Sequence, residues 1–218
     1  MAITNTKASR GHPSRSHGAG RPRDASRPRG PARREALLEA VLRIVADTGA
    51  DAVTHRRVAE VAQLPLASTT YWFDSKDHLL TAALELAAER DTARLLAHAA
   101  QLSAADGPGA LEAAVAAITE PLDEGLQASR GSLMATYALL LEAARRPALQ
   151  EVARGWTEVY LLTLSQLLER AGSSRPREDA ELLLGAADGL LIEQLASGEA
   201  SDLRPRLRRL AAALVQSS

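Results

Sequence analysis

The side chains best suited to chemistry lie in one short stretch, between residues 54 and 76. On a helix over 66–73, Ser68 and Tyr71 are three positions apart and share one side, with Thr70 beside them. Their hydroxyl and phenol groups can form hydrogen bonds with phosphate oxygens or with the edges of bases. The pattern therefore favours contact with nucleic acid.

Basic side chains stand at both ends of this stretch. The first turn of the preceding helix carries His55, Arg56 and Arg57 after the N-cap residue Thr54, and Lys76 follows the second helix. Each has a simpler alternative role, because Thr54 can act as a cap alone and the arginines can form a solvated face. Two arginines next to a hydroxyl-rich helix favour DNA contact over that alternative.

These side chains need a scaffold that can hold one helix in the major groove of DNA. Short helices over 55–62 and 66–73, joined by a tight turn, would form such a helix-turn-helix. Thr69, Trp72 and Phe73 are spaced at i, i+3 and i+4, which predicts the buried stripe of the second helix. We expect the two aromatic residues to anchor that helix without touching DNA.

Composition and motifs argue against an enzyme. The chain has no cysteine, which excludes thiol nucleophiles and cysteine-ligated zinc. Its five histidines form neither an H-E-x-x-H pair nor another two-histidine ligand spacing. Walker loops, G-x-S-x-G elbows and G-x-G-x-x-G turns are also absent from the sequence. We therefore expect no catalytic residue, no metal and no cofactor.

Charge is distributed unevenly along the chain. Residues 1–34 hold nine basic residues and one acidic residue, yet the formal net charge of all 218 residues is −1. A basic arm on an acidic body favours contact with nucleic acid or a membrane surface, and the alternative is a solvated leader. Residues 1–31, rich in Pro, Gly, Ser and Arg, are expected to be disordered. The sequence has neither a membrane-length apolar run nor a secretory signal, so we expect a cytoplasmic protein without a membrane partner.

The rest of the chain is predicted to be helical. Strong helix formers dominate from residue 32 onward, and no stretch alternates with a period of two, so the predicted fold is all-α. The clearest break falls at residues 106–109, and a further break is expected at residues 130–131. The expected helices cover 31–47, 55–62, 66–73, 76–101, 110–126, 130–145, 148–171, 177–197 and 202–216.

The last two of these helices carry a candidate dimer interface. Apolar side chains nearly encircle the helix over 177–197, which predicts burial on more than one side. Gly185 and Gly189 share one face, where a second helix could approach closely. The predicted two-fold interface consists of Leu183, Ala187, Leu190, Leu191, Leu207 and Leu210. The alternative is an ordinary internal bundle.

Residues 34–80 resemble the N-terminal domain of the tetracycline-repressor (TetR) family of transcriptional regulators. The resemblance rests on ALLEAVLRIVADTGADAVT, HRRVAEVAQ and, above all, LPLASTTYWFDSKDHLL. It implies a three-helix DNA-binding domain over 32–78 and a helical effector-binding and dimerisation domain over 79–218. The implied function is that of a homodimeric repressor that releases a palindromic double-stranded DNA operator on binding a small molecule. The alternative function is a helical binding or scaffold module that does not bind DNA.

The resemblance also implies roles for individual residues. Arg56 would read a base, with Thr54 and His55 close to the DNA backbone. Ser68 and Tyr71 would face the groove, and Thr70 and Lys76 would contact phosphates. Three residues depart from the family's pattern. Gln63 replaces the usual turn glycine and Thr69 a buried leucine, while Thr70 replaces a tyrosine and reaches less far.

An effector pocket is predicted from the few aromatic and large side chains of the second domain. Pocket walls are usually apolar, with a few polar anchors. The candidate pocket residues are Met134, Tyr137, Trp156 and Tyr160, which lie on two helices that could face each other. Core packing is the alternative role for each, and an interior rich in Ala and Leu favours an apolar or flexible ligand.

Overall fold

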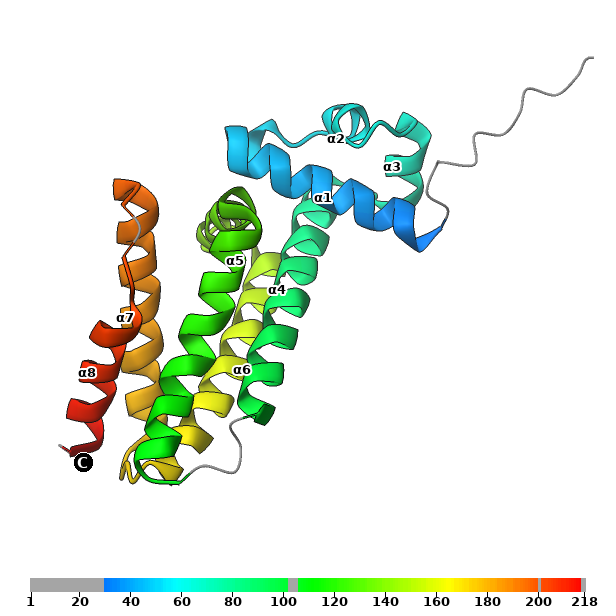
Figure 1. Cartoon of the computed structure of the whole chain (residues 1–218). Coiled ribbons are helices and arrows are strands. Elements are labelled where there is room, and N and C mark those ends of the chain that lie inside the picture. The colour runs from blue at the N-terminus through cyan, green and yellow to red at the C-terminus, as the bar shows by residue number, and fades with distance from the viewer. Residues whose placement is uncertain (1–29, 102–105, 200, 217–218) are drawn as a thin grey trace, which may run out of the picture.

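The computed structural model describes residues 30–101, 106–199 and 201–216 of the chain. Helices are the regular elements in these ranges, which confirms the predicted all-α fold. In chain order they are α1 (Pro31–Thr48), the short 3-10 helix η1 (Ala50–Ala52), α2 (His55–Val61), α3 (Leu66–Trp72), α4 (Lys76–Gln101), α5 (Pro108–Ala143), α6 (Pro147–Arg170), α7 (Pro176–Ser197) and α8 (Arg204–Gln216) (Figure 1). Residues 1–29 of the predicted disordered arm lie outside the described residues.

The first three helices pack around one apolar core, with α1 lying across α2, α3 and the start of α4 (Figure 1). Leu38 and Val41 of α1 are fully buried in the same cluster as Phe73, the residue that follows α3. Trp72 packs against this cluster and is partly buried. The aromatic pair therefore anchors α3, as its spacing predicts.

Two of the departures from the family's pattern are accommodated locally. Gln63 adopts a φ of 55°, the left-handed conformation that a side chain at this turn has to tolerate. The hydroxyl of the fully buried Thr69 donates to the carbonyl oxygen of Leu66 at 2.7 Å. Because that hydroxyl has a partner, its burial does not carry the cost of an unpaired polar group.

The prediction of two helices over 110–126 and 130–145, with a break near residues 130–131, agrees with the structure, where α5 consists of two helical segments joined across a kink. The kink lies at Ser129, one residue before the predicted break, where a φ of −170° and a ψ of 103° are not helical. The Oγ of Ser129 accepts a hydrogen bond from the backbone N–H of Ser132 at 3.1 Å, as an N-cap does. The local sequence signal thus marks a bend, and no loop separates the two segments.

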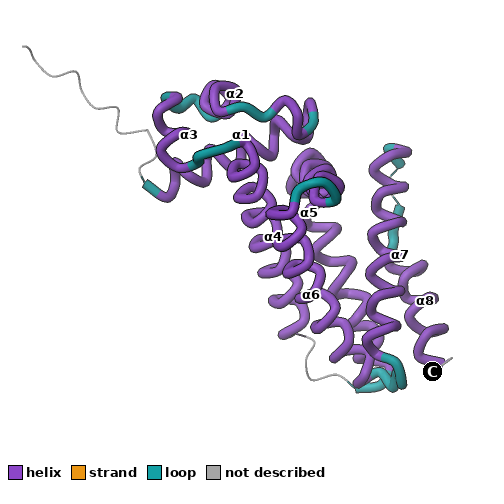
Figure 2. Tube along the Cα trace, turned by 180° about the vertical axis from the view of Figure 1, so that it is seen from behind, coloured by secondary structure: helices purple, strands orange, loops and turns teal. Residues whose placement is uncertain are grey.

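The helix α4 joins the two parts of the molecule. It begins beside α3 and continues into the bundle next to α5 and α6 (Figures 1 and 2), so the predicted boundary at residue 78 falls inside a continuous helix. In both views α7 and α8 lie on the side of the bundle away from α4. None of the described helices is long and apolar enough to cross a lipid bilayer.

The structure corrects most of the predicted dimer interface. Leu183, Ala187, Leu191 and Leu207 are at most 1% exposed within a single chain, where they pack α7 and α8 onto the rest of the bundle. The predicted interface residues Leu190 and Leu210 are partly buried against the same cluster. The apolar spacing therefore found the inward face of these helices, because a buried side chain cannot also form the surface that meets a partner.

Candidate nucleic-acid interface and ligand cavity

The outward side of α3 combines hydroxyl groups with one aromatic ring. Tyr71 is 78% exposed, and its ring lies edge-on to that of Trp72, with centroids 5.0 Å apart. Thr70 is exposed, while Ser68 is half-buried. The three side chains form a shallow polar surface on a helix whose opposite side is fixed in the core.

The helix α2 adds an exposed arginine next to that surface. Thr54 caps the helix, since its side-chain oxygen accepts a hydrogen bond from the N–H of Arg57 at 3.2 Å. The Nε of Arg56 lies 3.0 Å from a carboxylate oxygen of Glu60, and both side chains are mostly exposed. An ion pair this exposed contributes little to stability, so Arg56 can exchange Glu60 for another acceptor at little cost.

Two further predicted DNA-contacting side chains, His55 and Lys76, also have partners inside the protein. The Nε2 of His55 lies 3.0 Å from the carbonyl oxygen of Phe73, which ties the start of α2 to the end of α3. Lys76 donates from Nζ to the carbonyl oxygen of Asp51 at 3.0 Å, and the carboxylate of Asp51 lies 3.6 Å away. Lys76 would have to exchange these contacts in order to bind a phosphate.

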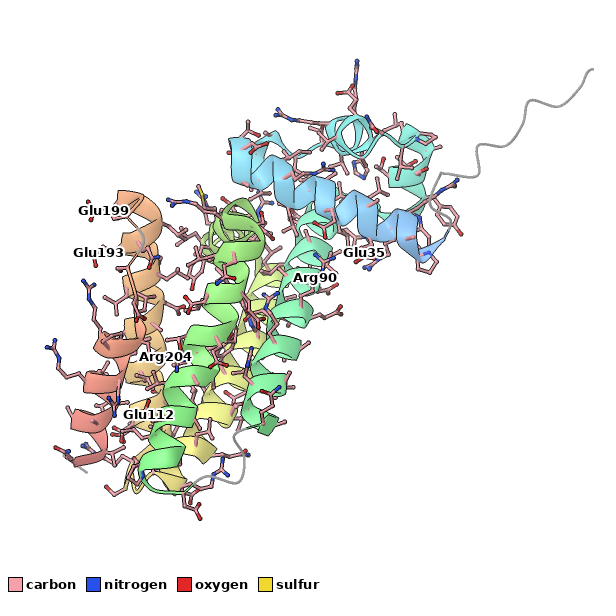
Figure 3. All side chains as sticks on the ribbon, viewed as in Figure 1. Glu35, Arg90, Glu112, Glu193, Glu199 and Arg204 are labelled. Atoms are coloured by element: carbon pink, nitrogen blue, oxygen red, sulfur yellow. The ribbon has the colours of Figure 1, made fainter. Side chains whose placement is uncertain are left out.

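Ion pairs join the first three helices to the bundle. Arg90 of α4 donates to Glu35 of α1 at 2.7 Å and also to Glu39, and Figure 3 shows Glu35 and Arg90 extending toward each other. At the start of α4, Asp77 accepts a hydrogen bond from Arg146, which precedes α6. The orientation of α1 is therefore tied to α4 by side chains that line or adjoin a cavity.

A cavity of about 600 Å³ lies between α1, α4, α5, α6 and α7. The α1 wall includes Glu39, Leu42 and Arg43, and the α7 wall includes Leu184 and Asp188. Its volume is within the range typical of small-molecule sites. A molecule in this cavity would touch the first helix of the molecule and an outer helix of the bundle at the same time.

One wall of the cavity holds a carboxylate with several donors. Asp91 of α4 is 9% exposed, and its Oδ2 accepts hydrogen bonds from the indole N–H of Trp156 at 3.1 Å and the phenol of Tyr160 at 2.6 Å. Its Oδ1 accepts one from Arg94 at 3.3 Å. Both oxygens of Asp91 are thus engaged, and its charge has a cationic partner.

A second carboxylate is placed differently. Asp188 of α7 accepts a hydrogen bond from the phenol of Tyr137 at 2.7 Å. Burial raises the pKa of Asp188 above its ordinary value, the hydrogen bond from Tyr137 opposes that rise, and the charge of Asp91 adds to it. Burial, together with these carboxylates, also raises the pKa of Tyr137 and Tyr160, so both phenols keep their protons and act as donors.

The cavity brings together three of the four predicted pocket residues. Tyr137, Trp156 and Tyr160 line it, whereas Met134 is outside its lining and is 41% exposed. The carboxylates were missed, and with them the charged character of a pocket expected to be apolar. Asp188 had left a signal, because it is the one charged residue in the apolar run over 182–192.

The outward face of α7 is apolar and open. It is formed by Leu182, Gly185, Gly189 and Ile192, all of them exposed. A Cβ atom added at either glycine would meet nothing within 4 Å. This stripe, which we call the α7 stripe, is the surface on which a second helix could approach closely. Among the described residues, no group of three or more His, Asp or Glu side chains could hold a metal ion.

Comparisons with known proteins cover most of the chain. The family model described as "Tetracyclin repressor-like, C-terminal domain" matches residues 106–217. The HTH-type transcriptional regulator BetI of Rhizobium meliloti (strain 1021) is 33% identical over 171 residues, which are 75% of this chain and 78% of BetI. A solved structure of a TetR-family member from Streptomyces coelicolor A3 is 32% identical with a TM-score of 0.69, over 84% of this chain and 98% of that one. The multidrug binding protein EbrR complexed with ethidium is 31% identical with a TM-score of 0.62, over 84% of this chain and 98% of EbrR.

Proposed function

The chain belongs to the tetracycline-repressor family of DNA-binding, ligand-responsive transcriptional regulators, and from this membership we propose that it represses transcription from a palindromic operator and leaves the DNA when a small molecule fills the cavity. Proteins of this family bind operator DNA and small-molecule effectors and form dimers. The observation that carries the proposal is that one cavity has walls from both α1 and α7.

In this proposal α3 enters the major groove of DNA with its polar side facing the bases. Tyr71 and Ser68 face the groove, and Arg56 reads a base from the start of α2. Thr70 and Lys76 would contact phosphates. Thr54 and His55 would hold the ends of α2 and α3 close to the DNA backbone. The exposure of Tyr71 and Arg56 supports these roles, since neither side chain is needed for the core.

We propose that dimers form through the α7 stripe rather than through the leucines expected from the sequence. A two-fold axis would place Gly185 and Gly189 against the same residues of a second copy, where the absence of side chains permits close helix contact. Leu182 and Ile192 would then cover each other at the ends of the stripe. Such a dimer presents two α3 helices to two half-sites related by symmetry.

Ligand binding would act by shifting the population of dimers. A ligand can change DNA affinity only if it binds the DNA-competent and the incompetent arrangement with different affinity. The lining of the cavity supports this proposal, because Glu39 and Arg90 line it and also form the ion pair that ties α1 to α4. EbrR, a relative of similar fold, is described as multidrug binding and holds ethidium, which supports a cavity that accepts organic molecules.

Selection of bound sequences from a random DNA library, followed by titration at several salt concentrations, tests the proposed function. The full chain should select a two-fold symmetric site and bind it with strong salt dependence. Ile192→Glu should be monomeric by light scattering and should lose selective binding, while its helix content stays unchanged because Ile192 is exposed. Salt-dependent binding without a preferred sequence, lost on deletion of residues 1–29, would instead favour the scaffold alternative.

A further inference from the structure

We infer that the cavity selects organic cations, whose positive group lies against the carboxylate of Asp188 and whose flat apolar part lies among Tyr137, Trp156 and Tyr160. This inference deepens the proposed function in assuming that the cavity is the effector site, but it can be tested without DNA. It assigns a ligand class to the cavity and a binding role to Asp188.

Four of the seven charged side chains that line the cavity form ion pairs. Arg90 is paired with Glu35 and Glu39, and Arg94 is paired with Asp91. Arg43 is exposed, and its guanidinium lies 3.4 Å from the carbonyl oxygen of Val61. In the part of the chain that the structure describes, no lysine, arginine or histidine pairs with Asp188. Arg43 and Asp47 also line the cavity without a printed ion pair, but both are exposed to solvent, so among the described residues the carboxylate of Asp188 is the partly buried charge at the cavity that lacks a counter-ion.

The environment of Asp188 penalises its charge in the absence of a ligand. Burial disfavours the carboxylate, and the charge of Asp91 disfavours it further. A ligand cation would offset both effects, because it supplies the missing counter-charge next to Asp188 and lies within the field of Asp91. A neutral ligand offers no such gain, and an anionic ligand would add a further negative charge.

Aromatic rings complete the recognition of a cation. Trp156 and Tyr160 lie edge to face, with ring centroids 6.5 Å apart and an interplanar angle of 68°. Their N–H and O–H groups are held by Asp91, which fixes the orientation of both rings, as Asp188 fixes that of Tyr137. Fixed aromatic faces beside a carboxylate attract cations through the ring quadrupole and tolerate flat apolar groups.

The same placement explains how a cation would be sensed. Asp188 belongs to α7, the helix proposed to form the dimer, and Asp91 belongs to α4, the helix that carries the DNA-binding unit. Without a ligand these two carboxylates repel each other. A cation held near both would reverse that repulsion and favour arrangements in which α4 and α7 are closer.

Fluorescence titration of the full chain with two probes of nearly the same shape tests the inference. The probes are N-methylacridinium, a permanent cation, and acridine, which is neutral at about pH 8. The wild-type protein should bind the cation at least about tenfold more tightly than acridine. Asp188→Asn keeps the shape and the acceptor for Tyr137 but removes the charge, so it should weaken cation binding at least about tenfold and change acridine binding less than about twofold.

Asp106→Asn is the matched control, because it removes the same charge from an exposed loop residue outside the cavity. It should leave both affinities unchanged. Equal affinities of the wild type for the two probes, no binding of the cation, or an unchanged cation affinity in Asp188→Asn would overturn the inference. If Asp188→Asn fails to fold, wild-type affinity for the cation must still exceed that for acridine and must fall as the pH is lowered.

The two proposals fail separately. Cation selectivity in a protein that shows no sequence-selective DNA binding would contradict the proposed function and leave the inference standing. Selective DNA binding by a protein that does not distinguish N-methylacridinium from acridine would do the opposite.

Discussion

The DNA-binding unit of α1–α3 and the bundle around the cavity use buried polar side chains in opposite ways. In the first, the side chains of Thr69 and His55 form hydrogen bonds with backbone carbonyls of the same unit. In the second, Asp91 and Asp188 bring carboxylates to the wall of the cavity. Thr69 and His55 of the DNA-binding unit thus have hydrogen-bond partners within that unit. The bundle instead presents carboxylates at a cavity, where a ligand can contact them.

The largest expected effect distinguishes residues that stabilise the core of the DNA-binding unit from residues that contact DNA. Phe73→Ala removes a fully buried ring from the core of α1–α3 and should lower the free energy of unfolding by about 3–5 kcal/mol. Tyr71→Ala, two residues earlier on the exposed side of α3, should change that free energy by less than about 0.5 kcal/mol and still reduce operator affinity. Urea unfolding and DNA titration of both variants make the comparison. If Tyr71→Ala destabilised the protein as much as Phe73→Ala, support and contact would not be separate functions.

A second, smaller effect distinguishes base reading from phosphate contact. Arg56→Ala should cost about 1–3 kcal/mol of operator binding and relax the preference at one base pair. Stability should hardly change, because the ion pair with Glu60 is exposed. Lys76→Ala should instead weaken binding to all sequences and make the salt dependence shallower. An unchanged salt dependence would show that Lys76 serves only to hold Asp51.

Sequence reasoning succeeded in the DNA-binding unit because its signals are local. The buried stripe of α3, the cap at Thr54 and the left-handed Gln63 all depend on residues a few positions apart. The bounds of α4 were likewise predicted as found, because Ser75, whose Oγ accepts a hydrogen bond from the N–H of His78, caps its start and a run of helix formers follows.

The bundle could be predicted less well, for two physical reasons. Leucines surround most of α7, so their spacing could not distinguish the buried Leu183 from the exposed Leu182, and packing against neighbouring helices decides between them. Two of the three side-chain donors to Asp91 are Trp156 and Tyr160, which lie 65 and 69 positions further along the chain. No local pattern encodes such a cluster, although the isolated charge of Asp188 in an apolar run was visible.

The smallest expected effect tests whether the bundle holds an unfavourable charge for the sake of its ligand. Burial raises the pKa of Asp188 in the folded state, so the protonated form is favoured there and ionisation at higher pH costs stability. Asp188→Asn should therefore raise the free energy of unfolding of the ligand-free protein by about 1 kcal/mol at neutral pH. The gain should disappear as the pH falls below the pKa of Asp188 in the folded protein, where the wild-type carboxyl is also neutral.

Groups from three other helices line the cavity with Asp188, and two of them affect its charge. Tyr137 on α5 donates to Asp188, Asp91 on α4 repels it, and Tyr160 on α6 stays neutral. Because Asp91 keeps its own partners in the variant, thermal unfolding across a pH series isolates the charge at residue 188. A variant less stable than the wild type at neutral pH would mean that the carboxylate stabilises the ligand-free bundle, and the contrast with the satisfied polar groups of the DNA-binding unit would then fail.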